Sequence, residues 1–230
     1  MEFLLLIADR AGEPPRTEVG VEEMGKFARE LAERGVLRGA TGPLRPADEG
    51  VRICAVSGAP VLTDGPFAEA KEVVAGYFVV DAPDRAAALD LAKRCPYVRA
   101  GLVELRAAQY WRRREPTAGA QFLLLYLRPV LPGPDEPRLA EMIAYSDELR
   151  RRGVHLEGAR LPPEEPVVQV EERGGRLIVH DGPFAESKEV VGGYALIQAP
   201  DRAAAIEIAS HVPHIRWGTL ELREVARRAP

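Results

Sequence analysis

A histidine and an aspartate are adjacent at positions 180 and 181, and a lysine follows at position 188. An imidazole titrates near neutral pH, and a carboxylate beside it can take part in the same proton transfer. His180 and Asp181 are therefore candidate catalytic residues, with Lys188 available to hold an anionic or carbonyl group of a substrate. On a strand, adjacent side chains point to opposite faces, so the pair can cooperate only where the strand has already turned.

The segment that contains Asp181 and Lys188 occurs twice. Residues 64–74 read DGPFAEAKEVV, and residues 181–191 read DGPFAESKEVV. Asp64 is thus a third candidate base or hydrogen-bond acceptor, and Lys71 is a second candidate anchor for a substrate. Burial would raise the pKa of either aspartate and make it a better base at neutral pH.

The repeated string also has a purely structural interpretation. Aspartate caps a turn, glycine supplies an unusual backbone angle, and proline fixes the next one. Glutamates at a helix start are favoured by the helix dipole and by pairing with residues one turn away. Turn chemistry explains Asp-Gly-Pro but not the following Glu-x-Lys-Glu, so both interpretations stay open.

Tyrosine and histidine could complete a binding site. Tyr77 and Tyr194 start matching strands and would give a cavity two aromatic walls with polar tips, although core packing explains them equally well. All histidines lie in the second half of the chain: His155, His180, His211 and His214. His211 and His214 are therefore candidate substrate-binding residues in that half. Their spacing and the lack of supporting carboxylates do not fit a metal site, so no metal is expected.

The composition argues against several classes of function. The chain of 230 residues is 46% hydrophobic and 29% charged, with a formal net charge of -4 and with acids and bases mixed throughout. These values are typical of a globular protein. The basic cluster at residues 112–114 is too short to form a nucleic-acid-binding surface, so no nucleic acid partner is expected.

We also expect neither a membrane partner nor a cofactor. No stretch approaches the roughly 18 apolar residues of a membrane span, and residues 3–8 are too short for the core of a signal peptide, which predicts a cytoplasmic protein. The glycine-rich loops of nucleotide- and flavin-binding proteins are absent from the sequence. Cys54 and Cys95 have no counterparts in the second half, which favours two small buried side chains over a disulfide.

The two halves show the same order of predicted elements. Each opens with an apolar run, at residues 3–7 and 122–126, that suits a strand buried on both faces. Apolar residues at helical spacing follow over residues 21–31 and 139–149. Each helix leads into an Arg-Gly-Val sequence, where glycine can take the left-handed conformation that ends a helix.

A hairpin, two further strands and a second helix complete each copy. The hairpins are predicted at residues 51–63 and 167–180, and the second helices after caps at Asp84 and Asp201. This order is the split pattern of a ferredoxin-like domain with an added hairpin, in the α+β class.

The repeat predicts two domains, at residues 1–107 and 120–226, joined by a linker at residues 108–119. Each is about 110 residues long, which suffices for a core of its own. A ferredoxin-like sheet covers one face with its helices, so the antiparallel sheets of the two lobes can pack face to face and enclose a cavity. We expect a pseudo-dimer within one chain, either monomeric or assembled into a homo-oligomer.

The Asp-Gly-Pro-Phe-Ala-Glu-x-Lys-Glu string, the following Gly-Tyr and the closing Val-Glu-Leu-Arg or Leu-Glu-Leu-Arg resemble the YCII-related family, in particular its DGPF-motif branch. The resemblance covers nearly all of both halves. It implies the dimeric alpha-beta barrel fold, which two chains normally form. The wider superfamily contains isomerases, a dehydrochlorinase and monooxygenases, so the fold does not fix the activity.

Two functions follow from these observations. One is the binding of a small polar or aromatic molecule between the lobes, with cofactor-free proton transfer of the isomerase or lyase type by His180 or Asp181. The alternative is a noncatalytic binding or regulatory module. The resemblance links that alternative to alternative sigma factors, because some members of the branch are encoded beside them.

Overall fold

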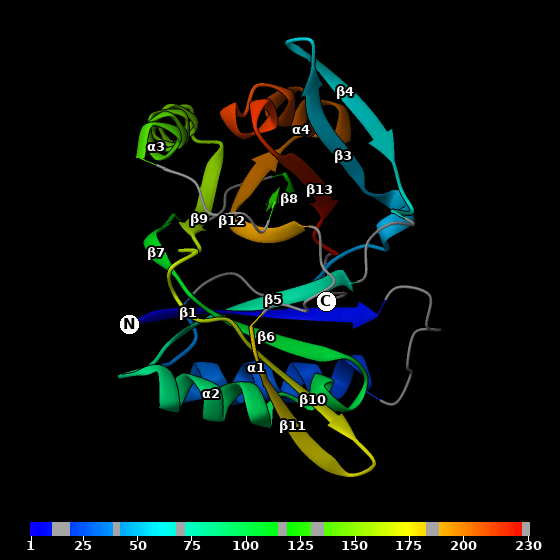
Figure 1. Cartoon of the computed structure of the whole chain (residues 1–230), viewed down its shortest axis with the longest axis vertical. Coiled ribbons are helices and arrows are strands. Elements are labelled where there is room, and N and C mark those ends of the chain that lie inside the picture. The colour runs from blue at the N-terminus through cyan, green and yellow to red at the C-terminus, as the bar shows by residue number, and fades with distance from the viewer. Residues whose placement is uncertain are drawn as a thin grey trace.

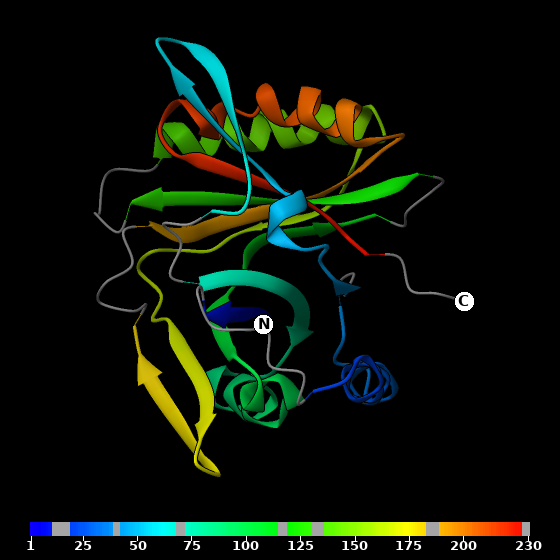
Figure 2. The same ribbon diagram turned by 90° about the vertical axis from the view of Figure 1, so that its right-hand side faces the viewer.

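The computed structural model describes residues 1–10, 19–38, 42–67, 72–114, 119–129, 136–182 and 189–226. The chain forms two α+β lobes, each with an antiparallel sheet and two helices (Figure 1). The sheets face each other at the centre of the molecule, and the helices cover their outer faces (Figure 2). This arrangement confirms the predicted pair of ferredoxin-like lobes packed as a barrel within one chain.

The first lobe contains a six-stranded sheet. Its strands, in spatial order, are β11 (Arg176–Asp181), β10 (Val168–Arg173), β6 (Leu102–Ala107), β1 (Glu2–Arg10), β5 (Glu72–Asp81) and β2 (Gly42–Pro43). The outer face carries helices α1 (Val21–Glu33) and α2 (Arg85–Arg94), with the short 3-10 helix η2 (Pro96–Arg99).

The second lobe contains a seven-stranded sheet. Its strands, in spatial order, are β4 (Ala59–Asp64), β3 (Val51–Val56), β13 (Thr219–Glu224), β8 (Ala120–Pro129), β12 (Glu189–Ala199), β9 (His155–Arg160) and β7 (Gln109–Arg113). Helices α3 (Glu136–Arg151) and α4 (Arg202–Ser210) cover it, and the 3-10 helices η1 (Ala47–Glu49) and η3 (Pro213–Arg216) flank it. In the described part of the chain, no helix is both long and apolar enough to span a lipid bilayer.

The two hairpins are exchanged between the lobes. Hairpin β3–β4 belongs to the first half of the sequence but pairs with β13 of the second lobe, and β10–β11 of the second half pairs with β6 of the first lobe. The colours of Figure 1 show the exchange directly, since the cyan hairpin lies beside the orange and red elements of the second half, and the yellow hairpin lies beside the green strand β6 of the first half. The sequence predicted both hairpins, and the structure shows that each completes the sheet of the other half.

The predicted linker at residues 108–119 is partly a strand. Within it, β7 pairs with β9 and forms one edge of the second sheet. Backbone pairing continues at Arg114, whose amide donates to the carbonyl of Leu156 at 2.6 Å. Residues 109–113 of the segment that we predicted as a linker therefore form an edge strand of the second sheet.

Each central strand is apolar along its length because both of its faces are covered. In β1, Phe3 and Leu5 pack with the helices of the first lobe, whereas Leu4 and Leu6 pack against the opposite sheet. The two helix-side cores also contain the exchanged hairpins, with Val170 in the first core and Ile53 in the second. Each buried side chain of this size contributes roughly 1.5–3 kcal/mol, so each lobe depends on residues from the other half.

A third apolar core fills the interface between the sheets. Its buried members include Leu4, Leu6, Tyr77 and Val79 of the first sheet, and Leu123, Leu125, Tyr194 and Leu196 of the second. The two tyrosine rings meet at this interface, with centroids 5.6 Å apart. The centre of the interface is therefore packed side chain against side chain.

The predicted ends of the helices are confirmed. The Asp84 carboxylate accepts a hydrogen bond from the amide of Ala87, and that of Asp201 accepts one from Ala204, each at 2.8 Å. Gly35 and Gly153 adopt φ angles of 67° and 75° directly after α1 and α3, which is the left-handed region that favours glycine.

Candidate functional site

Each copy of the repeated string connects the two sheets. The first copy begins at Asp64, the last residue of β4 in the second sheet, and leads to Glu72, the first residue of β5 in the first sheet. The second copy runs the opposite way, from Asp181 at the end of β11 to Glu189 at the start of β12. Lys71 and Lys188, our predicted anchors, lie outside the described residues.

The turn chemistry of the first copy is visible in the structure. The Gly65 amide donates to the carbonyl of Gly50 at 3.1 Å. A Cβ atom on Gly65 would overlap the backbone of Ala47, so only glycine fits at this crossing. Phe67 is buried, and its ring lies under the guanidinium of Arg52 with the Cζ atom 4.3 Å from the centroid. The first residues of the string thus fasten the chain to the second lobe.

Asp64, His180 and Asp181 do not form one site. Asp64 is 80% exposed and forms an ion pair with Arg202 at 3.3 Å. Asp181 is exposed on the outermost strand of the other sheet. Strand β11 continues through His180 to Asp181, so their side chains point to opposite faces.

His180 instead contacts a buried glutamate of the neighbouring strand. Its Nε2 atom lies 3.0 Å from Oε1 of Glu171, which is only 4% exposed. Arg10 and Arg173 also bind Glu171, at 2.5 and 3.0 Å. Burial raises the pKa of Glu171, but the hydrogen bonds from Arg10, Arg173 and His180 outweigh that effect and lower it overall. Glu171 is therefore an ionised carboxylate that orients the His180 imidazole.

Two further carboxylates, those of Glu72 and Glu104, lie on the same face of this sheet. The side-chain amide of Gln169 donates to Glu104 at 2.9 Å and makes a long contact to Glu72 at 3.5 Å. Burial, together with the charge of Glu104, raises the pKa of Glu72 to about 7, and the contacts with Gln169 and Arg10 only partly oppose this. Arg106 donates to the other oxygen of Glu104 at 3.2 Å. Near neutral pH, Glu72 can therefore both donate and accept a proton.

These residues form what we call the first-lobe cluster, defined as Arg10, Glu72, Glu104, Arg106, Gln169, Glu171 and His180. It lies on the face of the first sheet that is turned toward the second, since Glu104 is in register with Leu6 of the apolar interface. Gln169, Glu171 and His180 come from the exchanged hairpin. Both halves of the sequence are thus needed to assemble the cluster.

An equivalent group in the second sheet, the second-lobe cluster, consists of Arg52, Glu189, Thr219, Glu221 and Arg223. Arg52 donates twice to Glu221 at 3.0 Å and lies 3.7 Å from Glu189. Thr219 donates to Glu189 at 3.1 Å, and Arg223 donates to Glu221 at 3.1 Å. Here each carboxylate has a guanidinium beside it.

The two clusters differ at one decisive position. Gln169 and Arg52 hold the same place in their hairpins, opposite Glu104 and Glu221. The first lobe therefore has a neutral amide between its two glutamates where the second has a cation. With a neutral amide in this place, the charge of Glu104 adds to burial in raising the pKa of Glu72, although Arg106 pairs with Glu104 and Arg10 partly opposes the effect. Paired carboxylates of this kind occur among catalytic acids and bases.

The comparisons with known proteins agree with the duplicated fold. A family model for the YCII-related domain matches residues 1–112 and again residues 122–228. The chain belongs to the YCII-related family. Both matched ranges end a few residues beyond the predicted domains, and the first includes most of β7. A search of curated proteins found no match to the chain.

The two tyrosines predicted to line the site of this YCII-related chain, Tyr77 and Tyr194, are buried in the core. Tyr77 and Tyr194 are both 2% exposed within the packed interface, and the Tyr194 hydroxyl donates to Glu157 at 3.1 Å. Burial, with the nearby charge of Glu157, raises the pKa of Tyr77 well above its ordinary value. Both rings are packed within the apolar interface between the lobes.

The other histidines lie apart from the first-lobe cluster. His211 is exposed at the end of α4, where its Nδ1 atom lies 2.8 Å from the carbonyl of Glu207. His214 is buried, with Nε2 2.7 Å from the carbonyl of Leu127 and its ring near Tyr126. His155 is buried at the start of β9. The predicted substrate-binding residues His211 and His214 are therefore not brought together with His180.

Sequence reasoning found His180 but missed the glutamates around it. Glu104 was noted only as part of the closing Val-Glu-Leu-Arg, although a charged pair inside an apolar strand is itself a signal of a buried polar site. Glu72 was read as part of the string's Lys-Glu. The alternation of Gln169 and Glu171 on one face of a strand could have indicated the hairpin's contribution.

Proposed function

We propose that the protein binds a small polar molecule at the first-lobe cluster and transfers a proton on it without a cofactor, as an isomerase or lyase does. The observation that supports this most directly is the pair of glutamates, Glu72 and Glu104, bridged by the neutral Gln169. The equivalent glutamates of the second-lobe cluster, Glu189 and Glu221, have the guanidinium of Arg52 between them. The proposed activity therefore belongs to the first-lobe cluster alone.

Glu72 is the proposed acid and base. A pKa of about 7 matches the pH at which the group must both accept and return a proton. Glu72 is half-buried and is the first residue of β5. A base of this strength suits the removal of a proton next to a carbonyl group, and we propose such a carbon acid as the substrate class.

His180 is the proposed second proton carrier. It is 43% exposed, and the ionised Glu171 fixes its orientation as a carboxylate does for a catalytic histidine. This pairing replaces the predicted His180–Asp181 pair, whose side chains face apart. Lys71 precedes Glu72 in the sequence and stays the predicted anchor for the substrate carbonyl.

Deuterium exchange tests this proposal without knowledge of the natural substrate. The full chain is incubated in D₂O with pyruvate, 2-oxoglutarate, phenylpyruvate and cyclohexanone, and loss of the α-proton signals is followed by NMR. We expect the wild-type protein to accelerate exchange of at least one probe. Glu72→Gln should reduce this rate at least 100-fold, because it removes the base while retaining the shape.

Glu189→Gln is the matched control, since Glu189 is the counterpart of Glu72 in the second-lobe cluster. It should retain the wild-type exchange rate. His180→Ala should lower the rate less than Glu72→Gln does. No exchange of any probe by the wild-type protein, or equal rates for wild type and Glu72→Gln, would refute the proposed activity.

A noncatalytic binding module is the second candidate function, and one observation favours it. The outermost strands of both sheets expose apolar side chains: Val61, Leu62, Leu177 and Val179. Exposed apolar edges of this kind are common at protein-protein contacts. The exchange experiment separates the two candidates, because a module of this kind accelerates no proton transfer.

We also infer that the chain belongs to the DGPF-motif branch of its family. The complete Asp-Gly-Pro-Phe string occurs in both copies. In the first copy its glycine and phenylalanine fasten the crossing between the sheets, so the motif has a structural task whether or not the neighbouring cluster is catalytic.

A further inference from the structure

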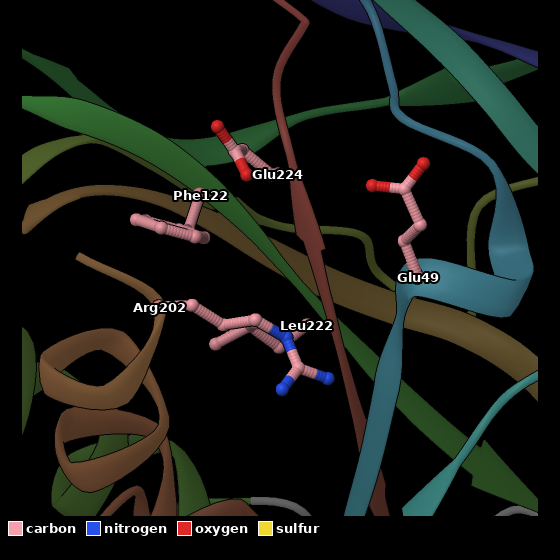
Figure 3. A pocket seen from close by; sticks show the side chains of 5 residues that line it. All are labelled: Glu49, Phe122, Arg202, Leu222 and Glu224. Carbon is pink, nitrogen blue, oxygen red and sulfur yellow. The ribbon is translucent and has the colours of Figure 1, made fainter.

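A pocket of about 280 Å³ opens on the helix-covered face of the second sheet (Figure 3). Its base is formed by Phe122 of β8 and Leu222 of β13, both of which belong to the core beneath α3 and α4. The two polar clusters lie on the faces between the sheets. The pocket is therefore separate from the proposed catalytic site.

Charged groups of opposite sign line the pocket on two sides. Figure 3 shows the carboxylates of Glu49 and Glu224 toward one end and the guanidinium of Arg202 toward the other. Glu49 is held by Arg45 through one oxygen, at 2.5 Å. The main-chain carbonyl of Glu224 accepts a hydrogen bond from the Arg45 amide at 2.9 Å, and its carboxylate interacts with the Arg45 guanidinium through charge alone, without a hydrogen bond or ion pair to any described residue. Oxygens of both glutamates are thus available to accept hydrogen bonds from a ligand.

Arg202 is equally available for an anion. Its described ion pair, with Asp64, is a single contact of 3.3 Å between two exposed side chains. Such surface pairs contribute little and are readily replaced. The guanidinium can instead hold a carboxylate through two parallel hydrogen bonds, which is the geometry that favours arginine over lysine.

The equivalent place in the first lobe lacks this arrangement. Arg85 corresponds to Arg202, but its guanidinium donates to the carbonyl of Pro166 at 2.6 Å. Pro166 and Ala107 stand where the second lobe has Glu49 and Glu224. The carboxylates of Glu49 and Glu224 therefore occur together in the second lobe alone, so they are not a requirement of the fold that both lobes share.

We propose that this pocket binds a small zwitterion of the α-amino acid class. The ammonium group lies between Glu49 and Glu224, the carboxylate lies on Arg202, and an apolar side chain packs against Phe122. A volume of about 280 Å³ is at the lower end of ligand pockets, which suits a molecule of this size. The pocket has carboxylates on one side and a guanidinium on the other. A ligand that carries only one of the two charges should bind more weakly, because the charged groups on the other side then stay unpaired.

Titration calorimetry of the full chain tests the proposal with L-leucine, L-valine and L-phenylalanine. Two analogues accompany L-leucine: 4-methylpentanoate, which lacks the amine, and 3-methylbutylamine, which lacks the carboxylate. We expect at least one amino acid to bind and both analogues of leucine to bind at least tenfold more weakly than leucine. Failure of all three amino acids to bind, or equal binding of either analogue, would overturn the proposal.

Substitutions then assign the contacts. Arg202→Gln and Glu224→Gln should each weaken amino acid binding at least tenfold, and Arg202→Lys should have an intermediate effect because it keeps the charge but not the fork. Arg85→Gln, at the equivalent place in the first lobe, is the matched control and should bind as wild type does. Unchanged binding by both Arg202→Gln and Glu224→Gln, or an equal loss in Arg85→Gln, would place the ligand elsewhere.

Discussion

Gln169 and Arg52 occupy equivalent positions in the two exchanged hairpins, and the difference between them sets the electrostatics of each cluster. Arg52 supplies a cation to Glu221 and Glu189, whereas Gln169 supplies one neutral amide to Glu104 and Glu72. The raised pKa of Glu72 is therefore attributed to burial beside a second carboxylate, which the hydrogen bond from Gln169 and the charge of Arg10 only partly offset.

Exchanging these two side chains should exchange the behaviour of the clusters. Gln169→Arg should lower the pKa of Glu72 from about 7 toward its ordinary value, because a guanidinium then lies between the two glutamates. Carboxyl-carbon NMR titration measures this directly. The second lobe already accommodates an arginine at this place, so we expect the variant to fold.

The reciprocal change, Arg52→Gln, serves as the control. It leaves the buried Glu221 without its strongest partner and should cost about 2–4 kcal/mol of unfolding free energy. An unaltered Glu72 titration in Gln169→Arg would show that this amide does not control the first-lobe cluster.

Two side chains should give the stability of the protein opposite dependences on pH. Glu72 has a folded pKa of about 7, above its ordinary value of 4.5, so its contribution is present at low pH and is lost as the pH rises through 7. Burial and the charge of Arg150 lower the pKa of His155 to about 4, so its contribution is lost as the pH falls from 6.5 to 4. The two slopes largely cancel in the wild type.

Single substitutions should reveal each slope. Glu72→Gln should be more stable than the wild type at pH 8, by on the order of 2 kcal/mol, and should lose stability more steeply on acidification. His155→Leu should resist acidification down to about pH 4 and become less stable toward neutral pH. Urea unfolding at a series of pH values measures both effects. Parallel curves for wild type and variants would contradict these assignments.

Among the strands and helices, the sequence predicted almost every element but could not predict which sheet each hairpin joins. The apolar periodicity, the aspartate caps and the glycines after α1 and α3 are local signals, and they are confirmed. Hairpin choice is not local. Val51-Arg52-Ile53 fits beside Glu221, but the repeated sequence around Glu104 offers a nearly identical edge.

The site was only partly predicted because its contacts also join residues that are distant in the sequence. His180 was recognisable from its residue type, whereas its partner Glu171 lies across a hairpin pair and Glu104 lies on a strand of the other half. The behaviour of Glu72 depends on burial and on a carboxylate that is distant in sequence. Pairings of this kind become visible only once the exchange of hairpins is known.

For the whole molecule, the exchange predicts that the two lobes unfold together. Each helix-side core contains residues from both halves, and a third core joins the sheets. Neither lobe can therefore unfold without removing strands from the other. We expect one transition in differential scanning calorimetry, with the calorimetric enthalpy equal to the van't Hoff enthalpy for the full chain.

Two cavity-forming substitutions test whether the lobes unfold in one transition. Ile53 belongs to the first half of the sequence but packs in the core of the second lobe, whereas Val170 belongs to the second half but packs in the core of the first lobe. Ile53→Ala and Val170→Ala therefore each create a cavity in the lobe that the exchanged hairpin joins. Each should cost about 2–3 kcal/mol and should lower the melting temperature of the entire molecule. If the lobes were energetically independent, each variant would instead split the transition and shift only the lobe whose core it alters. A single displaced transition in both variants would show that the exchanged hairpins and the core between the sheets together make the lobes one cooperative unit.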